Sequence, residues 1–231
     1  MYKRQIVFAS HAIYDDLGSD WLNNENITGT IISGAQEPSD PNNGSCLIVR
    51  GGGLGYSGNP QPEIIGLSFQ DGDGTSMTLD NCGSPSQIRA GGAILMYKAY
   101  PTIMYNRFIN NGHDNDNLRA GRGGRIGGAM GHFADDGVEF DEDRSFSSHN
   151  NNQENNSDRD IPETLNVTNN YFENNASGDG ANFFSHGYEG SIDVSNSIFE
   201  DIDCETNSVN EFVLKSDEDE ADYLQNDISG N

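Results

Sequence analysis

Two adjacent aspartates and a histidine are the side chains of this sequence with the spacing to perform acid–base catalysis. Asp135 and Asp136 lie seven and eight residues after Gly128, and His186 lies six residues after Gly180. If the two glycines begin equivalent coils of a repeating fold, these side chains are expected to be stacked neighbours. Two carboxyls held apart by several ångströms can hydrolyse a glycosidic bond, because one protonates the leaving oxygen while the other activates water.

Three arginines, Arg119, Arg122 and Arg125, lie within seven residues in a glycine-rich segment. The chain has only 12 Lys and Arg residues against 37 Asp and Glu residues, a net charge of -25. In such an acidic chain, a basic patch could bind the carboxylate or sulfate of an anionic sugar through bidentate pairing. The alternative is that these arginines only balance neighbouring carboxylates, since exposed ion pairs contribute little to stability.

Four aspartates are candidate ligands for Ca²⁺, which binds carboxylate oxygens. Asp71 and Asp73 flank a glycine in a tight turn, and Asp141 and Asp143 lie in a long acidic segment. Neither run completes the pattern of an EF-hand loop. The alternative for the acidic segment is a solvated loop that binds no metal.

The composition restricts the classes of partner. A net charge of -25 would repel nucleic acid phosphates and anionic lipid surfaces, so neither is an expected partner. No apolar run approaches the roughly 20 residues of a membrane helix, so no membrane insertion is expected. The cysteines Cys46, Cys82 and Cys204 lack the spacing of a zinc site, and one disulfide with one free thiol is possible.

Short repeated segments must position these side chains. Five copies of a motif with an apolar residue, a spacer, a Phe or Ile and then Asn or Asp begin at residues 62, 101, 165, 192 and 223. The shared aromatic residues are Phe69, Phe108, Phe172 and Phe199, and Ile228 takes this place in the last copy. Apolar and polar residues alternate with the period of a strand, over runs too short for helices.

This repeat predicts an all-β fold, a right-handed parallel β-helix solenoid with long loop insertions. Its phenylalanines are expected to form one internal column, and Asn110 and Asn174 a ladder of amide hydrogen bonds. Residues 1–26 are interpreted as an N-terminal segment and cap, and residues 27–231 as β-helix coils. Insertions are expected near residues 112–125 and 134–161, on the flank where solenoids commonly bind ligands.

Both termini are interpreted as cut. Residues 1–5 match the translation of a sequencing-library transposon end, and residues 226–231 stop inside the repeated motif. We therefore expect a truncated metagenomic fragment whose residues 1–5 are not native.

Segments 31–34, 64–72, 91–94 and 101–103 resemble the pectin-lyase-like right-handed β-helix repeats of bacterial surface or secreted proteins. The resemblance covers about residues 27–231 and implies a secreted or cell-surface location. It also implies extracellular polysaccharide or cell-surface glycan as partner. The function expected from it is noncatalytic display of loops for adhesion or glycan binding. The alternative is a polysaccharide-degrading enzyme, either a polygalacturonase-like hydrolase or a Ca²⁺-dependent lyase.

The enzymatic alternative finds partial support in the residues. Asp135, Asp136 and His186 look like a partial copy of the paired aspartates and histidine of polygalacturonases. The Asn-Thr-Asp and Arg-x-Lys segments of that family are missing, and His186 stands in Ser-His-Gly rather than Gly-His-Gly. A lyase would need an arginine or lysine base beside Ca²⁺, for which Arg89 and Arg107 are available.

Overall fold

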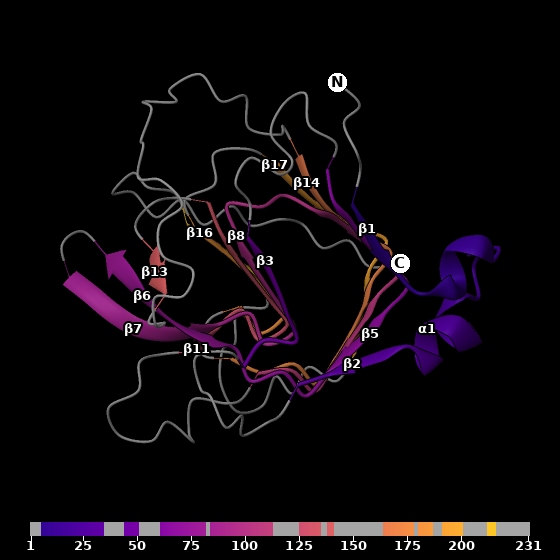
Figure 1. The fold of residues 1–231 in the computed structure, drawn as a ribbon, viewed down its shortest axis with the longest axis horizontal. Coiled ribbons are helices and arrows are strands. Elements are labelled where there is room, and N and C mark those ends of the chain that lie inside the picture. Colours follow the sequence, from indigo (N-terminus) through magenta and orange to yellow (C-terminus); the bar gives the residue numbers. More distant parts are fainter. Residues whose placement is uncertain are drawn as a thin grey trace.

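The computed structural model describes residues 6–34, 44–50, 61–81, 84–112, 125–134, 138–140, 164–177, 180–186, 191–200 and 212–215. Within these ranges the chain is all-β, with short helices only near residues 11–29. Most strands are parallel and stack in sheets that enclose one interior, seen end-on in Figure 1. None of the helices in these ranges is long and apolar enough to cross a membrane.

Three five-stranded parallel sheets make up most of the fold. Sheet A contains β1 (Val7–Ala9), β4 (Glu63–Ile65), β9 (Thr102–Met104), β14 (Thr164–Thr168) and β17 (Ser191–Ser195). Sheet B contains β2 (Ile31–Ser33), β5 (Ser68–Gln70), β10 (Arg107–Ile109), β15 (Tyr171–Glu173) and β18 (Ile198–Glu200). Sheet C contains β3 (Leu47–Arg50), β8 (Ile94–Tyr97), β12 (Met130–Phe133), β16 (Phe183–His186) and β19 (Phe212–Lys215).

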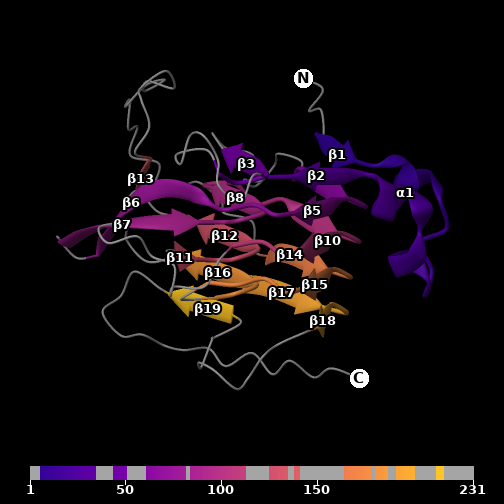
Figure 2. The same cartoon turned by 90° about the horizontal axis from the view of Figure 1, so that it is seen from below.

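The chain visits the three sheets in turn and then returns to the first, one level further along the stack (Figure 2). Each new strand pairs in register with the strand one level earlier, so equivalent residues of successive levels are hydrogen-bonded neighbours. This arrangement confirms an all-β fold of stacked parallel sheets and is compatible with a β-helix.

A fourth sheet, sheet D, projects from this stack. It contains β11 (Arg125–Ile126), β7 (Ser84–Ala90), β6 (Thr75–Asn81) and β13 (Val138–Phe140). The strands β6 and β7 form an antiparallel hairpin, to which β11 adds parallel and β13 adds antiparallel. The hairpin lies between β5 and β8 in the chain, so it is an insertion at the corner between sheets B and C.

The predicted phenylalanine column is confirmed. Phe69, Phe108, Phe172 and Phe199 occupy one register position of sheet B. Their ring centroids are 5.4, 5.0 and 4.8 Å apart along the column, and the planes are nearly parallel. The in-register spacing of parallel strands is close to the thickness of stacked rings, so each ring covers its neighbours. The column therefore forms one wall of the hydrophobic core.

Asparagine ladders stabilise two corners, but at different residues from those predicted. Asn106 donates to Asn170 Oδ1 at 3.2 Å at the corner between sheets A and B. Asn111 donates to Asn175 Oδ1 at 3.0 Å at the corner between sheets B and C. The expected ladder residues, Asn110 and Asn174, are instead exposed, and each has a positive φ, of 55° and 52° respectively. Each precedes the asparagine that makes the ladder, because the corner needs one left-handed residue before the buried amide.

Glycines bring two stretches of backbone together where the insertions leave and re-enter the stack. We call this place the glycine neck and define it as Gly72, Gly92, Gly112 and Gly128. A Cβ atom on Gly92 would collide with backbone atoms of the other three, and one on Gly72 would collide with the Gly92 carbonyl. The Gly112 amide donates to the Gly72 carbonyl at 2.7 Å. Any side chain at Gly92 would force these backbones apart.

The N-terminal segment packs on the outer face of sheet B. It contains two 3-10 helices, η1 (His11–Tyr14) and η2 (Trp21–Asn23), and the helix α1 (Glu25–Gly29). The indole of Trp21 is buried and meets the ring of Tyr105 edge-on, with 5.6 Å between centroids. Trp21 also belongs to a hydrophobic cluster with Ile27 and Tyr171. Its ring is thus used for packing against the side of the stack.

Candidate functional site

The strand β12 of sheet C lies, in the order of the chain, between the two predicted insertions. Residues 113–124 precede β11 and β12 in the chain, and residues 141–163 follow β13, so both segments are attached close to β12. The corner between sheets A and B, by contrast, is made of only two residues at every level after the first, such as Tyr105 and Asn106. Insertions are therefore confined, within the described part of the chain, to the two ends of the sheet C strands and to the N-terminal segment.

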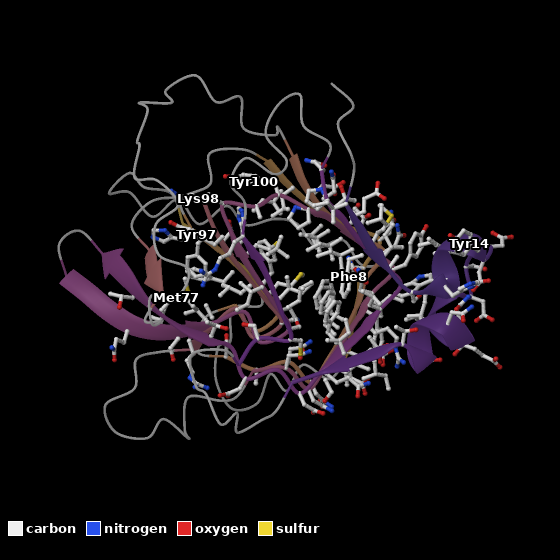
Figure 3. All side chains as sticks on the ribbon, viewed as in Figure 1. Phe8, Tyr14, Met77, Tyr97, Lys98 and Tyr100 are labelled. Atoms are coloured by element: carbon white, nitrogen blue, oxygen red, sulfur yellow. The ribbon has the colours of Figure 1, made fainter. Side chains whose placement is uncertain are left out.

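The strands of sheet C alternate between the core and the outer face. The side chains of Ile94 and Met96 belong to the central core, whereas Leu95 and Tyr97 belong to a second cluster outside the sheet. This second cluster is covered by the β6–β7 hairpin, which contributes Met77. Figure 3 shows Tyr97 on the side of sheet C that faces Met77. The hairpin therefore covers part of the outer face.

One row of this face combines basic and aromatic residues. The register of sheet C aligns Arg50 with Tyr97, Tyr97 with Phe133, Phe133 with His186, and His186 with Lys215. We call these five positions the sheet C row. Not one is acidic, although the chain carries 37 Asp and Glu residues. The row could not be predicted from the sequence, because its successive members are 29 to 53 residues apart and only the register brings them together.

The first half of the row is partly exposed. Arg50 and Tyr97 have intermediate exposure, and the ammonium of Lys98 lies 5.3 Å from the centroid of the Tyr97 ring. An aromatic ring offers a flat apolar surface, and neighbouring cations can pair with carboxylate or sulfate groups. This part of the row has the chemistry needed to bind an anionic sugar.

Of the predicted catalytic residues, only His186 is described. It is buried, with 9% exposure, and its ring centroid lies 6.5 Å from that of Phe133. Its register neighbours are Phe133 and Lys215, so the position opposite it on β12 is aromatic rather than acidic. Asp135 and Asp136 lie outside the described residues, as do Asp141 and Asp143 of the predicted calcium site.

The predicted arginine patch leads into sheet D. Arg119 and Arg122 lie outside the described residues, but Arg125 begins β11 and pairs in register with Arg89 of β7. Arg89 is buried and forms an ion pair with Asp73. The structure therefore pairs the backbone of Arg125 with that of an arginine whose charge is already balanced by a carboxylate.

The predicted calcium ligand Asp73 is buried in the turn that precedes β6. Its carboxylate contacts the guanidinium of Arg89, and both residues line a small hollow beside the glycine neck. Asp71, two residues earlier, has a positive φ of 58°. Among the described residues, no group of three or more His, Cys, Asp or Glu side chains is arranged to hold a metal ion. The structure thus gives Asp73 a cationic side chain as its counter-ion.

A second polar cluster lies on the outer face of sheet B. The hydroxyl of Tyr171 is 2.8 Å from Glu200 Oε2 and 3.1 Å from Glu173 Oε2. Burial, together with the two carboxylates, raises the pKa of Tyr171 well above its usual value. The guanidinium of Arg107, the other candidate lyase base, lies 5.5 Å from the centroid of the Tyr171 ring. Arg107 is thus held by a cation–π contact.

One cysteine is described. Cys46 is free and partly buried, and its thiol donates to the Gln70 carbonyl at 3.4 Å. Burial raises the pKa of this thiol to about 11, so it is almost entirely protonated at neutral pH. Cys82 and Cys204 lie outside the described residues.

The core contains a histidine that faces inward from β12. His132 is fully buried, and its Nδ1 lies 2.9 Å from the hydroxyl of Ser185 one level further along. The ring of Tyr100 meets its imidazole edge-on, with 5.3 Å between centroids. Burial lowers the pKa of His132 from 6.5 to about 3, because a charged imidazolium is poorly solvated there.

This lowered pKa predicts a pH-dependent loss of stability. Below pH 6.5 the unfolded chain protonates at His132 while the folded chain does not, so this contribution is complete above pH 6.5 and is lost as pH falls toward 3. In a His132→Met variant, which repeats Met96 of the neighbouring level, the contribution is absent. The free energy of unfolding of the variant relative to the wild type should rise by about 2 kcal/mol between pH 7.5 and pH 5.

Urea unfolding of both proteins at the two pH values measures this difference. The many carboxylates titrate alike in both proteins, so their contribution cancels when the variant is compared with the wild type. Leaving the Ser185 hydroxyl without its imidazole neighbour costs the same at both pH values, so this cost cancels when the two pH values are compared. Parallel pH profiles for the two proteins would show that the imidazole titrates alike in the folded and unfolded states.

Comparison with protein-family models, with curated proteins and with solved structures finds no match for this chain. The geometry of the sheet C row is therefore the basis on which its function must be argued.

Proposed function

We propose that the chain is part of a right-handed parallel β-helix of the pectin-lyase-like kind, located in a secreted or cell-surface protein. Its role is to bind an anionic polysaccharide or cell-surface glycan, without cleaving it, through the partly exposed first half of the sheet C row, Arg50 and Tyr97, with the adjacent Lys98. The observation that carries the proposal is the in-register pairing of the partly exposed Arg50 and Tyr97, with the Lys98 ammonium beside the Tyr97 ring, in a chain of net charge -25. A basic and aromatic row in an acidic chain favours an anionic ligand with apolar faces.

The position of the insertions supports the same role. Residues 51–60 directly follow β3, whose last residue is Arg50, so this segment begins at the end of sheet C where the row lies. Loops at one edge of a rigid scaffold are a common place for binding residues. Arg119 and Arg122, in the segment that precedes β11 in the chain, are proposed to contribute to the same ligand.

Binding can be measured by affinity electrophoresis and calorimetry with polygalacturonate, alginate and a sulfated glycan. We expect at least one of these polyanions to bind, more weakly as the salt concentration rises because the contacts are ionic. Replacing Tyr97 with alanine or Arg50 with glutamine should weaken binding about tenfold or more. Arg107→Gln on sheet B serves as the matched control, since it removes a partly buried strand arginine from a different face, and should leave binding unchanged.

The same samples test the enzymatic alternative. Release of new reducing ends, or absorbance from unsaturated products, would contradict the noncatalytic proposal, especially if His186→Ala and Asp136→Asn abolish it. Equal loss of binding in Arg107→Gln and Arg50→Gln would show that the chain attracts polyanions without a defined site. The sheet C row would then be rejected as the binding site.

A further inference from the structure

The strands β1, β2 and β3 form one end of the three sheets, which we call the N-terminal end. Each is the last member of its sheet in the described part of the chain, and Figure 2 shows all three at the same end of the stack. Each therefore has one backbone edge that no described strand pairs with. Open edges of this kind readily pair with strands of another chain.

The core is also open at this end. Phe8 of β1 is 42% exposed, whereas Ile64, its in-register neighbour one level further in, is 2% exposed. Ile32 of β2 is partly exposed, whereas its neighbour Phe69 is completely buried. Figure 3 shows Phe8 within the space that the sheets enclose. Side chains that are buried at every inner level are thus left in contact with solvent at the N-terminal end.

The charges identify what can cover this end. The strands β1, β2 and β3 contain no Asp or Glu, and Arg50 is their one charged residue. Two copies of a chain with a net charge of -25 repel each other over most of their surfaces. Because these three described strands carry no carboxylate, two copies can pair them without burying negative charge from the strands. The last described strands of sheets A and B, by contrast, carry the exposed residues Asp193 and Glu200.

We propose that two copies of the chain associate through their N-terminal ends, with the same surface used on both. Such a contact has twofold symmetry and closes as a dimer. It pairs open strand edges across the interface and removes Phe8, Ile31 and Ile32 from water. The interface meets the sheet C row only at Arg50, the last residue of β3.

Two matched substitutions test the interface. Ile31 is 51% exposed on β2, and Ile198 is 38% exposed on β18, at the same row of sheet B but at its opposite end. Sedimentation velocity over a range of concentrations should show a dimer for the wild type and for Ile198→Lys. Ile31→Lys should raise the dissociation constant of the dimer at least tenfold, because it places a charge in the contact.

Hydrogen exchange provides a readout that does not depend on the variants. Amides of β1 and β2 should exchange more slowly as the wild-type concentration rises, while those of β17 and β18 should not change. A wild type that stays monomeric at every concentration would overturn the proposal. So would open-ended polymers, or a loss of association in Ile198→Lys equal to that in Ile31→Lys.

Discussion

Replacing Phe108 with alanine is expected to lower the free energy of unfolding by about 3–5 kcal/mol, the usual cost of truncating a buried phenylalanine. Phe108 is fully buried and lies between Phe69 and Phe172, with ring centroids 5.4 and 5.0 Å away. Removing it leaves a cavity in the middle of the column that rigid, hydrogen-bonded strands on either side cannot close. Urea or guanidinium unfolding followed by circular dichroism measures the loss.

The matched comparison is Phe199→Ala at the far end of the same described column. Phe199 is partly exposed and stacks on Phe172 at 4.8 Å. A site near solvent can be refilled by water, so this variant should lose about half as much stability. Equal losses of unfolding free energy in the two variants would show that the interior of the column is no better packed than its end, and would contradict a tightly stacked core.

Replacing Asn106 with leucine is expected to cost about 3 kcal/mol or more, although the new side chain has a similar size. The buried amide of Asn106 accepts a hydrogen bond from the Leu67 amide at 3.0 Å and donates to the Ile64 carbonyl at 2.9 Å and to the Met104 carbonyl at 3.0 Å. Leucine would deprive these backbone groups of that partner, and each buried polar group left unsatisfied costs about 1–3 kcal/mol.

Asn174→Gly is the control for this variant. Asn174 is exposed and has a positive φ of 52°, a conformation that glycine adopts without strain. Its unfolding free energy should stay within about 0.5 kcal/mol of the wild type. A loss in Asn106→Leu no larger than that in Asn174→Gly would show that the ladder amides add nothing to the stability of the corners.

The aromatic column could be predicted from the sequence because it depends on local alternation and on a repeated motif. Phe69, Phe108, Phe172 and Phe199 each follow a short alternating run, and parallel pairing in register then forces them into one row. The asparagine ladder was misplaced by one residue. The sequence has two adjacent asparagines at 110–111 and 174–175, and composition does not say which of the two takes the left-handed conformation.

The neighbours of His186 were also misjudged by one position. Gly91, Gly127 and Gly180 share a positive φ of 61–63°, so Gly180 corresponds to Gly127 rather than to Gly128. This shift of one residue in the alignment depends on backbone conformation, which cannot be read from the Gly-Ala sequence motif. Because β12 and β16 pair accordingly, Phe133 is the residue opposite His186.

The β6–β7 hairpin was not predicted, although it lies within an interval longer than a basic coil. Its strands alternate apolar and polar residues as the coil strands do, with Met77 and Ile88 directed at the outside of sheet C. From its sequence, a segment with that alternation is indistinguishable from a strand of a β-helix coil, so it does not indicate an inserted hairpin. The sheet C row was equally hidden, because it exists only once the register of five strands is known.

The glycine neck lets the protein change its outer segments independently of its coils. The hairpin leaves the stack near Gly72 and returns near Gly92, where the two backbones touch. A segment whose ends already meet can be shortened, lengthened or exchanged for another without moving the strands that follow. Related chains could therefore acquire new ligand preferences by exchanging the segment inserted at this corner, while the three stacked sheets keep the same structure.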